Sequence, residues 1–116
     1  MTRASLVVVN YNTASDLRAC LASAREKLGD AEVVVVDNGS TDGSVEMVRE
    51  EFPWALLVEN PGNPGYASAC NRGLRAASCP YAFILNSDVV FVEGGLDRLL
   101  DFMDERPEVG ALGPLV

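Results

Sequence analysis

Short runs of apolar, sheet-forming residues alternate along the whole chain with segments of helical periodicity, and this alternation constrains the fold more than any other feature. The runs are Leu6–Val9, Val33–Val36, Ala55–Val58 and Ala82–Leu85, with a last short apolar stretch from Val109 to Leu115. All four runs are predicted to be strands, and the first two, Leu6–Val9 and Val33–Val36, are typical of strands buried on both faces. Strand–helix repetition therefore predicts an α/β fold with a mainly parallel sheet flanked by helices.

Four helices are predicted from apolar residues at helical spacing. Their apolar faces are Leu17, Cys20, Leu21, Ala24 and Leu28; Val45, Val48 and Phe52; Ala67, Cys70, Leu74 and Ala77; and Leu96, Leu99, Leu100 and Met103. Thr13 with Asp16 resembles a capping box at the start of the first helix, and Gly29 is a suitable stop. Pro53 and Pro107 limit the second and fourth helices.

Composition excludes several classes of function. The 116 residues fit one domain, and their formal net charge of −8 argues against a nucleic-acid backbone as partner. The chain has no histidine, so acid–base or metal chemistry must use carboxylates. The three cysteines lack metal-type spacing and predict no disulfide framework, which fits a cytoplasmic protein. Cys20 and Cys70 fall on predicted helix core faces and are expected to be buried. No apolar run is long enough to span a bilayer.

Polar residues collect in the loops that follow the four predicted strands. These loops are Asn10-Tyr11-Asn12, Asp37-Asn38-Gly39-Ser40, Asn60 to Pro64, and Asn86-Ser87-Asp88. Each loop alone has a structural interpretation, because Asn, Asp and Gly also form turns. Ligands of open α/β sheets bind outside the carboxyl ends of the strands, so four polar loops at that edge predict a binding site.

The residue types in these loops suit a nucleotide. An exposed Asp37 carboxylate would accept hydrogen bonds from a base edge that carries N–H donors, as in uracil, thymine or guanine. Tyr11 offers a face for stacking on a flat ring, although packing on the rim of the core is an equal alternative. Asp88 is either a turn residue or a ligand of the divalent cation that an acidic protein needs to hold a diphosphate.

Four segments in this order and spacing resemble family 2 glycosyltransferases of the GT-A fold. They are SLVVVNYN, VVVVDNGSTDGS, ENPGNPGYASACNRG and ILNSDVV, and the third of them, with PEVGALGP, is most similar to the rhamnosyltransferase-like branch. The resemblance covers essentially the whole chain. It implies a Rossmann-like GT-A sheet and transfer of a sugar, with metal assistance and inversion, from a nucleoside-diphosphate sugar to an acceptor hydroxyl.

The resemblance also implies roles for individual residues. The segment 10–12 matches the first nucleotide-contacting loop, Asp37 the aspartate that reads the base, and Asn71 a helix residue near the nucleotide-sugar. The segment 86–88 matches an Asp-any-Asp motif whose last Asp approaches Mg²⁺ or Mn²⁺, so Asp88 is the expected metal ligand. The predicted nucleotide-sugar site is Asn10, Tyr11, Asn12, Asp37, Asn38, Gly65, Asn71, Asn86, Ser87 and Asp88.

Two residues depart from the family pattern. Asn86 replaces the first Asp of the metal motif, which leaves Asp88 as the principal ligand. Cys70 stands where many relatives carry Arg, and this puts a phosphate or ribose contact from that position in doubt.

The resemblance further implies that residues 1–116 are the donor-binding segment of a longer, here truncated, domain. The acceptor-binding half and the catalytic base would lie beyond residue 116, so no catalytic residue is expected here and the chain alone should be inactive. The expected partners are a UDP- or dTDP-sugar and, through the missing half, a saccharide or lipid-linked acceptor. A cytoplasmic location is expected, or a peripheral one at the inner face of the membrane for the longer protein.

Two alternatives remain at this stage. One is a non-catalytic nucleotide-sugar-binding module. The other is a sugar-nucleotide pyrophosphorylase, which would require a glycine-rich loop with Arg and Lys where NYNTASD stands. Surfaces that the missing half would cover also predict self-association.

Overall fold

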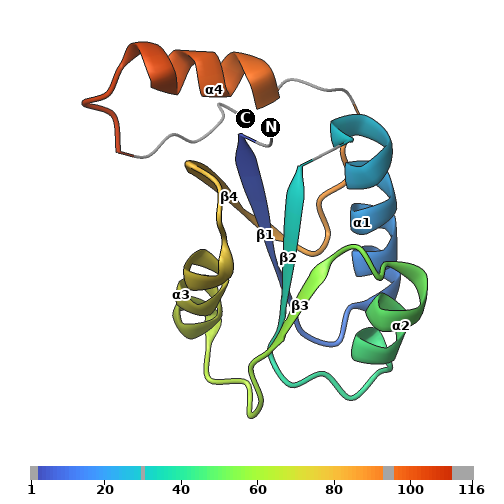
Figure 1. The fold of residues 1–116 in the computed structure, drawn as a ribbon. Helices are drawn as coiled ribbons and strands as arrows, with labels where there is room; N and C mark the ends of the chain where they lie inside the picture. The colour runs from blue at the N-terminus through green and yellow to red at the C-terminus, as the bar shows by residue number, and fades with distance from the viewer. Residues whose placement is uncertain (1–2, 30, 93–95, 111–116) are drawn as a thin grey trace.

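A computed structural model describes residues 3–29, 31–92 and 96–110, and within them four strands alternate with four helices (Figure 1). The elements are β1 (Ala4–Asn10), α1 (Ala14–Leu28), β2 (Glu32–Asp37), α2 (Ser44–Glu51), β3 (Leu56–Glu59), α3 (Tyr66–Ala76), β4 (Tyr81–Asn86) and α4 (Leu96–Glu105). All strand pairs are parallel, in the order β3-β2-β1-β4. The predicted α/β class and parallel sheet are confirmed.

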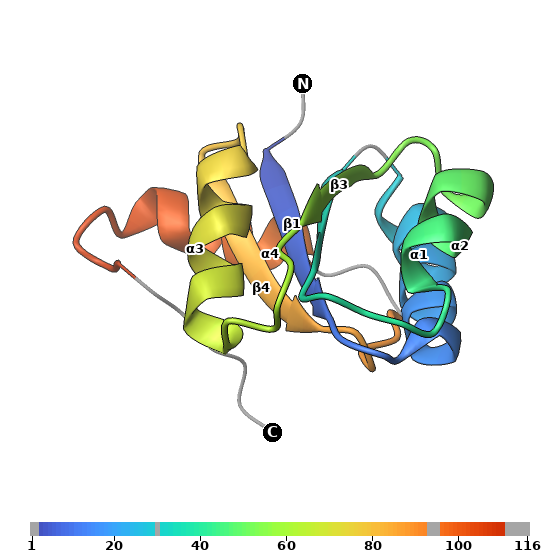
Figure 2. The ribbon, with the colours of Figure 1, turned by 90° about the horizontal axis from the view of Figure 1, so that it is seen from below.

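The two central strands separate two layers of core. Along β1, Leu6 and Val8 pack toward α1 and α2, whereas Val7 and Val9 pack toward α3. Residues of β2 alternate in the same way, since successive side chains of a strand point to opposite faces. This explains why β1 and β2 are unbroken apolar runs. Figure 2 shows α1 and α2 on one side of the sheet and α3 on the other.

The order in which successive strands are added to the sheet reverses between β1 and β4, and this reversal determines where the binding edge lies. The chain moves outward from β1 to β3 through α1 and α2, then crosses back over the opposite face through α3 to pair β4 with β1. Parallel crossovers are right-handed, so helices of the outward and returning connections must cover different faces. The carboxyl ends of β1 and β4 therefore form the switch point at which such sheets bind ligands.

Helix α3 approaches the sheet on a face that differs in part from the one that the sequence predicts. Its buried residues are Ala69 and Gly73. Of the predicted face, Cys70 and Ala77 pack against this core, but Ala67 and Leu74 are exposed, so the prediction is wrong for these two. A Cβ atom at Gly73 would overlap Val7 Cγ1 and approach Val36 Cγ2 to 3.0 Å. The small residues are buried because they allow the helix backbone to lie close to the central strands.

The amino edge of the sheet is held by Glu32. Its Oε1 accepts hydrogen bonds from Ser5 Oγ at 2.6 Å and from the Ser78 backbone N–H at 2.9 Å. Its Oε2 accepts from Ser78 Oγ at 2.6 Å. These bonds, the Ser5 hydroxyl first, lower the pKa of Glu32 below its usual value. The carboxylate thus joins the starts of β1 and β2 to the turn that leads into β4.

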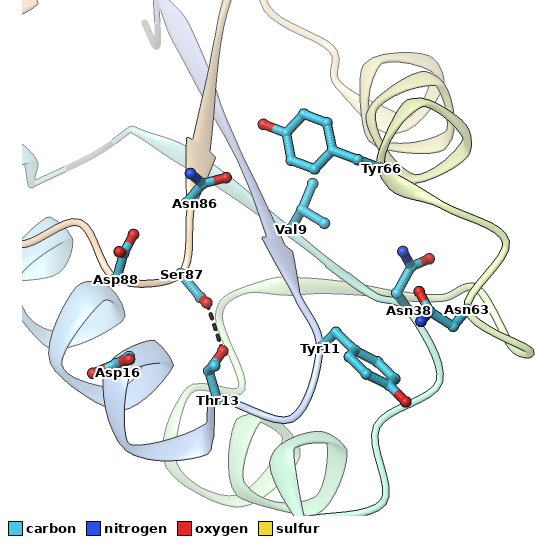
Figure 3. Close-up of a pocket in the computed structure, with 10 residues that line it drawn as sticks. All are labelled: Val9, Tyr11, Thr13, Asp16, Asn38, Asn63, Tyr66, Asn86, Ser87 and Asp88. Carbon is cyan, nitrogen blue, oxygen red and sulfur yellow. Dashed lines mark hydrogen bonds between the residues drawn. The ribbon is translucent and has the colours of Figure 1, made fainter.

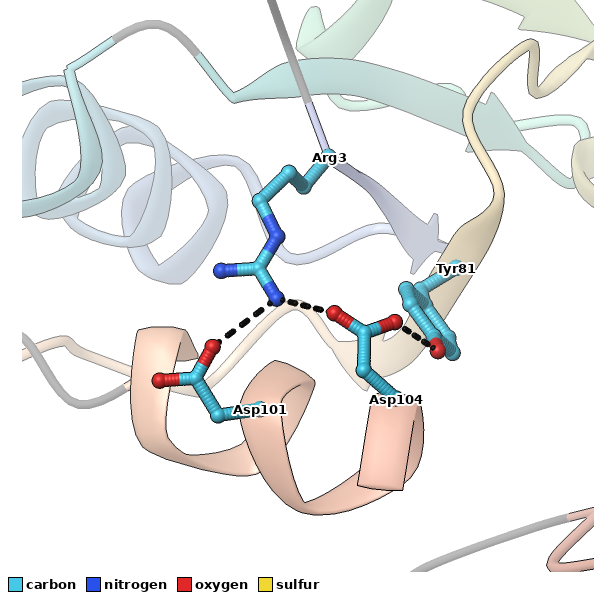
Figure 4. Close-up of polar contacts among 4 residues, drawn as sticks. All are labelled: Arg3, Tyr81, Asp101 and Asp104. Carbon is cyan, nitrogen blue, oxygen red and sulfur yellow. Dashed lines mark hydrogen bonds and ion pairs between the residues drawn. The ribbon is translucent and has the colours of Figure 1, made fainter. Parts of the chain in front are cut away.

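Helix α4 is attached at the same edge by a second polar cluster (Figure 4). Arg3 Nη2 lies 3.1 Å from Asp101 Oδ1 and 2.7 Å from Asp104 Oδ2. The Tyr81 hydroxyl donates to Asp104 Oδ1 at 2.5 Å. The cluster connects α4 to the starts of β1 and β4, at the end of the sheet opposite to the switch point.

Strand β4 is an edge strand in the described sheet, and one of its faces is open. Ala82, Ile84 and Asn86 are exposed on the side of α3, because α3 packs over β1 and β2 instead. Phe83 and Leu85 face the opposite core. No helix among the described residues is long and apolar enough to cross a membrane. The apolar stretch predicted from Val109 to Leu115 lies mostly outside the described residues.

Candidate functional site

The loops that follow β1, β2, β3 and β4 meet at the carboxyl edge of the sheet and enclose an open pocket of about 390 Å³ (Figure 3). Its lining residues are Val9, Tyr11, Thr13, Asp16, Asn38, Asn63, Tyr66, Asn86, Ser87 and Asp88. The volume is in the range of small-molecule sites. None of the ten lining residues is basic, whereas Asp16 and Asp88 are acidic.

Five residues of the predicted site line this pocket: Tyr11, Asn38, Asn86, Ser87 and Asp88. The ring of Tyr11 is 46% exposed, which excludes a position packed into the core. Asn86 and Asp88 are also exposed, and the Asp88 side chain forms no hydrogen bond with a described residue. Their polar atoms are therefore available to a ligand.

Asp37 differs from its prediction. The exposed carboxylate expected from the sequence is only 3% exposed, so that expectation is wrong. Its Oδ1 accepts from Asn10 Nδ2 at 3.0 Å and Ser40 Oγ at 2.7 Å. Its Oδ2 accepts from the backbone N–H groups of Gly39 at 3.2 Å and Ser40 at 2.9 Å. Four donors occupy the lone-pair positions of the carboxylate, which holds the loop after β2 in place.

Asp37 also lines a second, smaller pocket of about 300 Å³ beside the first. The other residues around it are Gly39, Ser40, Val45, Glu59, Asn60, Pro61 and Gly62. The two pockets lie on either side of the loop after β2, since Asn38 lines one of them and Asp37 and Gly39 the other. A ligand edge that reaches Asp37 would do so from this second pocket.

The remaining predicted residues support the site or lie outside it. Asn10 is fully buried and bonds to Asp37, and Asn12 accepts the backbone N–H of Thr41 at 2.7 Å. Gly65 precedes α3, and its carbonyl accepts from Asn38 Nδ2 at 3.2 Å. Asn71 is exposed on α3 and lines neither pocket. The first three shape the loops, whereas the position of Asn71 gives no direct support to its predicted role.

A second network joins the loop after β3 to α3. Asn60, which is buried, donates from Nδ2 to Asn38 Oδ1 at 2.9 Å. Arg72 Nη1 donates to Asn60 Oδ1 at 2.9 Å. Asn60 therefore fixes Asn38 against the start of α3, where one wall of the larger pocket lies.

Four lining residues with polar atoms are outside the predicted list of site residues: Thr13, Asp16, Tyr66 and Asn63, although Asn63 belongs to one of the four predicted loops. Thr13 and Asp16 were interpreted as a capping box, but the Thr13 side chain forms no capping hydrogen bond. Tyr66 is 52% exposed at the first turn of α3. An aromatic residue directly after Gly65 was the available signal for it, since a helix start beside a glycine-rich loop exposes its first side chains.

Asp16, Asn86 and Asp88, called the acidic wall of the pocket from here on, suit a hard divalent cation. Asp16, Asp88 and Asn86 bring carboxylate and amide oxygens to one pocket, and such oxygens are the ligands that Mg²⁺ and Mn²⁺ prefer. No group of three acidic or cysteine side chains placed for a metal occurs among the described residues. The donor set therefore fits a cation that takes its remaining ligands from a bound phosphate and water.

Cys20 lies near this wall but is not a candidate ligand. Burial, and secondarily the charge of Asp88, raises the pKa of the Cys20 thiol to about 11. The thiol is thus protonated at neutral pH, and only a thiolate binds metals well. All three cysteines are free; the predicted burial of Cys20 is confirmed, whereas Cys70 is only partly buried.

The protein is thus an open parallel α/β protein with a pocket at its switch point. The pocket has the size of a small-molecule site, and acidic and aromatic residues line it. The chain matches the model of the glycosyl transferase family 2 over residues 5–116, and it belongs to that family. The predicted family and the GT-A fold are confirmed.

The chain is similar to named sugar transferases. The N-acetylglucosaminyl-diphospho-decaprenol L-rhamnosyltransferase of Mycobacterium tuberculosis is 34% identical over 125 residues, which cover 96% of this chain and 40% of the relative. The solved mannosyltransferase PcManGT of Pyrobaculum calidifontis, in complex with GDP-Man and Mn²⁺, is 35% identical with a TM-score of 0.71 over 84% of this chain and 30% of that one. TarS of S. aureus has a TM-score of 0.76 at 24% identity, over 90% of this chain and 20% of its own. The chain thus spans well under half the length of these proteins.

Proposed function

We propose that this chain is the donor-binding part of a glycosyltransferase that transfers a sugar from a nucleoside-diphosphate sugar to an acceptor hydroxyl, with metal assistance and inversion at the anomeric carbon. The observation that carries the proposal is the pocket at the switch point, which combines an exposed tyrosine ring with an acidic wall. The similarity to the mannosyltransferase solved with GDP-Man and Mn²⁺ supports it.

Each wall of the pocket has a role in this proposal. Tyr11 stacks on the base or supports the ribose, and Asn38 and Tyr66 also line the pocket. Asp37 recognises the base from the second pocket, where a ligand N–H would replace one of its four internal donors. Asp88, with Asp16 and Asn86, would hold Mg²⁺ or Mn²⁺ beside the diphosphate.

Charge explains why a cation belongs in this arrangement. A diphosphate is strongly anionic, whereas the lining residues include two carboxylates and no Lys or Arg. When bound, the cation would neutralise negative charge on the departing nucleoside diphosphate. The same absence of basic lining residues argues against the pyrophosphorylase alternative, which must hold a triphosphate.

The proposed activity needs a part of the protein beyond this chain. We place the acceptor site and the base that deprotonates the acceptor hydroxyl outside residues 1–116, and the greater length of the relatives, of which this chain spans 40% or less, supports this placement. The chain by itself should bind the donor without transferring sugar. Its three free cysteines fit our placement of the protein in the reducing cytoplasm.

Calorimetric titration of UDP, dTDP, GDP and CDP, each with and without Mn²⁺, tests the proposal. We expect Mn²⁺ to tighten binding of UDP or dTDP by about tenfold or more, because a cation held by Asp88 would offset the charge repulsion between the carboxylates and the diphosphate. Asp88→Asn should remove most of this gain. CDP should bind more weakly than UDP, since the base edge of cytosine presents an acceptor where that of uracil presents an N–H.

The control is Asp101→Asn, which makes the same change at the opposite edge of the sheet. It should leave both affinities unchanged. Equal affinity for every nucleotide with and without Mn²⁺, in wild type and Asp88→Asn alike, would refute the metal assignment. If none of the four nucleotides binds, the donor-binding function is wrong.

A further inference from the structure

A continuous chain of hydrogen bonds runs beneath the larger pocket, across the carboxyl edge of the sheet. Thr13 Oγ1 lies 2.6 Å from Ser87 Oγ and 2.7 Å from Asn10 Oδ1. Asn10 Nδ2 in turn donates to Asp37 Oδ1 at 3.0 Å. These hydrogen bonds link the carboxyl ends of β4, β1 and β2, and Figure 3 shows the first of them, between Thr13 and Ser87.

The donors in this chain have one consistent direction. A hydroxyl has a single proton to donate, and the Thr13 proton is used on Asn10 Oδ1, which is an acceptor. The Ser87 hydroxyl must therefore donate to Thr13 Oγ1. Thr13 Oγ1 therefore accepts from Ser87 and donates to Asn10, and hydrogen bonds connected through one hydroxyl in this way strengthen one another.

Asp88 depends on this link for its position. Its own side chain forms no hydrogen bond with a described residue, so the backbone next to it determines where the carboxylate lies. The neighbour Ser87 is only 8% exposed and is tied down by its hydroxyl. The segment is also held by a turn in which the Val89 N–H donates to the Asn86 carbonyl at 3.2 Å and, further on, by the Phe91 N–H, which donates to Ser23 Oγ at 2.9 Å.

Thr13 is not engaged in capping, which would otherwise explain its hydroxyl. It is the residue before α1, yet its side chain makes no hydrogen bond to the helix backbone. The Ala14 N–H at this helix start is satisfied by Asp42 Oδ2 at 3.0 Å instead. The hydroxyl is committed to the contact between loops.

We propose that Thr13 is a positioning residue that holds the loop 86–88 in place, so that the Asp88 carboxylate stays in the pocket and cation-assisted binding of the diphosphate is coupled to the loop that carries Asp37. This inference rests on the proposed function, because it concerns how the same site is assembled. It gives Ser87, expected only as part of the metal motif, a defined task as the anchor of Asp88.

The test compares Thr13→Val, which removes both hydrogen bonds, with Thr13→Ser, which keeps them. The quantity measured is the metal dependence, defined as the Kd for UDP without Mn²⁺ divided by the Kd with Mn²⁺, on the 116-residue chain. Thr13→Val should reduce the metal dependence by about fivefold, the effect of one or two lost hydrogen bonds, while the metal-free Kd changes by less than about twofold. Thr13→Ser should restore the wild-type ratio.

Two further variants complete the experiment. Ser87→Ala removes only the first bond and should lower the metal dependence in the same direction, and it carries the test if Thr13→Val melts before the assay temperature. Thr41→Val is the matched control, because Thr41 is exposed and its hydroxyl bonds to no described residue. It should leave the metal dependence unchanged.

The outcomes separate this inference from the function on which it rests. A wild-type chain without metal-dependent nucleotide binding would overturn both. Metal dependence that survives in Thr13→Val and Ser87→Ala would overturn the positioning role alone. Equal loss of affinity with and without Mn²⁺ would also overturn it, since that pattern indicates general damage to the pocket.

Discussion

At the scale of single residues, Glu32 makes the stability of the protein depend on pH. Its carboxylate accepts three hydrogen bonds that lower its pKa in the folded state. A carboxyl group with a lowered folded pKa stabilises the protein above its unfolded pKa, and this contribution is lost as the pH falls through the folded pKa. Glu32→Gln should therefore cost about 1 kcal/mol at pH 7.

The difference between wild type and Glu32→Gln should shrink as the pH falls below the usual glutamate pKa of about 4.3. Urea unfolding of both proteins at pH 7, 5 and 3.5 measures it. Glu50→Gln is the control, because Glu50 is exposed on α2 and bonds to no described residue. A difference that is constant over this pH range would show that Glu32 does not act through its charge.

Residue scale is also where prediction from sequence was least complete. The position of Asp37 at the carboxyl end of a buried strand was predicted correctly, but its burial was not. Gly39 and Ser40 supply three of its four donors from the adjacent turn, and the fold adds the fourth, Asn10, from 27 positions away. The link from Thr13 to Ser87 joins residues 74 positions apart. No local sequence pattern predicts such a contact, because it forms only after β4 has paired with β1.

At the scale of elements, the packing of α3 on the sheet predicts the effect of one methyl group. Gly73→Ala places a Cβ atom against Val7 and Val36, which are fully buried in the two central strands. We expect it to destabilise the protein by about 1–3 kcal/mol, the cost of overpacking a core. In an exposed helix the same change stabilises by up to about 1 kcal/mol.

Thermal unfolding followed by circular dichroism measures this effect. Gly110→Ala is the control, because a Cβ atom there has no neighbour within 4 Å. A Gly73→Ala protein as stable as wild type would show that α3 can move away from β1 without penalty.

The same helix explains why one element was misjudged from the sequence. Hydrophobic periodicity locates the buried face by the largest apolar residues, and on α3 it selected Leu74. The sheet instead selects the smallest residues, Ala69 and Gly73, since β1 and β2 already fill the layer with valine. The strands were predicted more accurately, because in a run such as 33–36 every side chain is apolar, so no face of the strand is suited to solvent.

At the scale of the whole molecule, the open side of β4 predicts self-association. Ile84 is 42% exposed on an edge strand, and Val90 and Val92 are exposed just beyond it. An edge strand with apolar side chains is a template for pairing with a second chain. We expect the 116-residue chain to form dimers or larger species at high concentration.

Sedimentation velocity over a range of concentrations measures this, with Ile84→Lys as the variant that should shift the protein toward monomer. Leu56→Lys is the matched control on β3, at the other edge of the sheet. A wild-type chain that remains monomeric at every concentration would contradict the prediction.

The parallel pairing of β1 with β4 also determines when the pocket can form during synthesis. The first strand pairs with residues 81–86, and the anchor of Asp88 reaches back to residue 13. Folding that depends on contacts so distant in sequence is slow, because the intervening chain must be ordered first. A ribosome that has released only the first 80 residues has exposed β1 without its final neighbour, so completion of the pocket must be among the last events of folding.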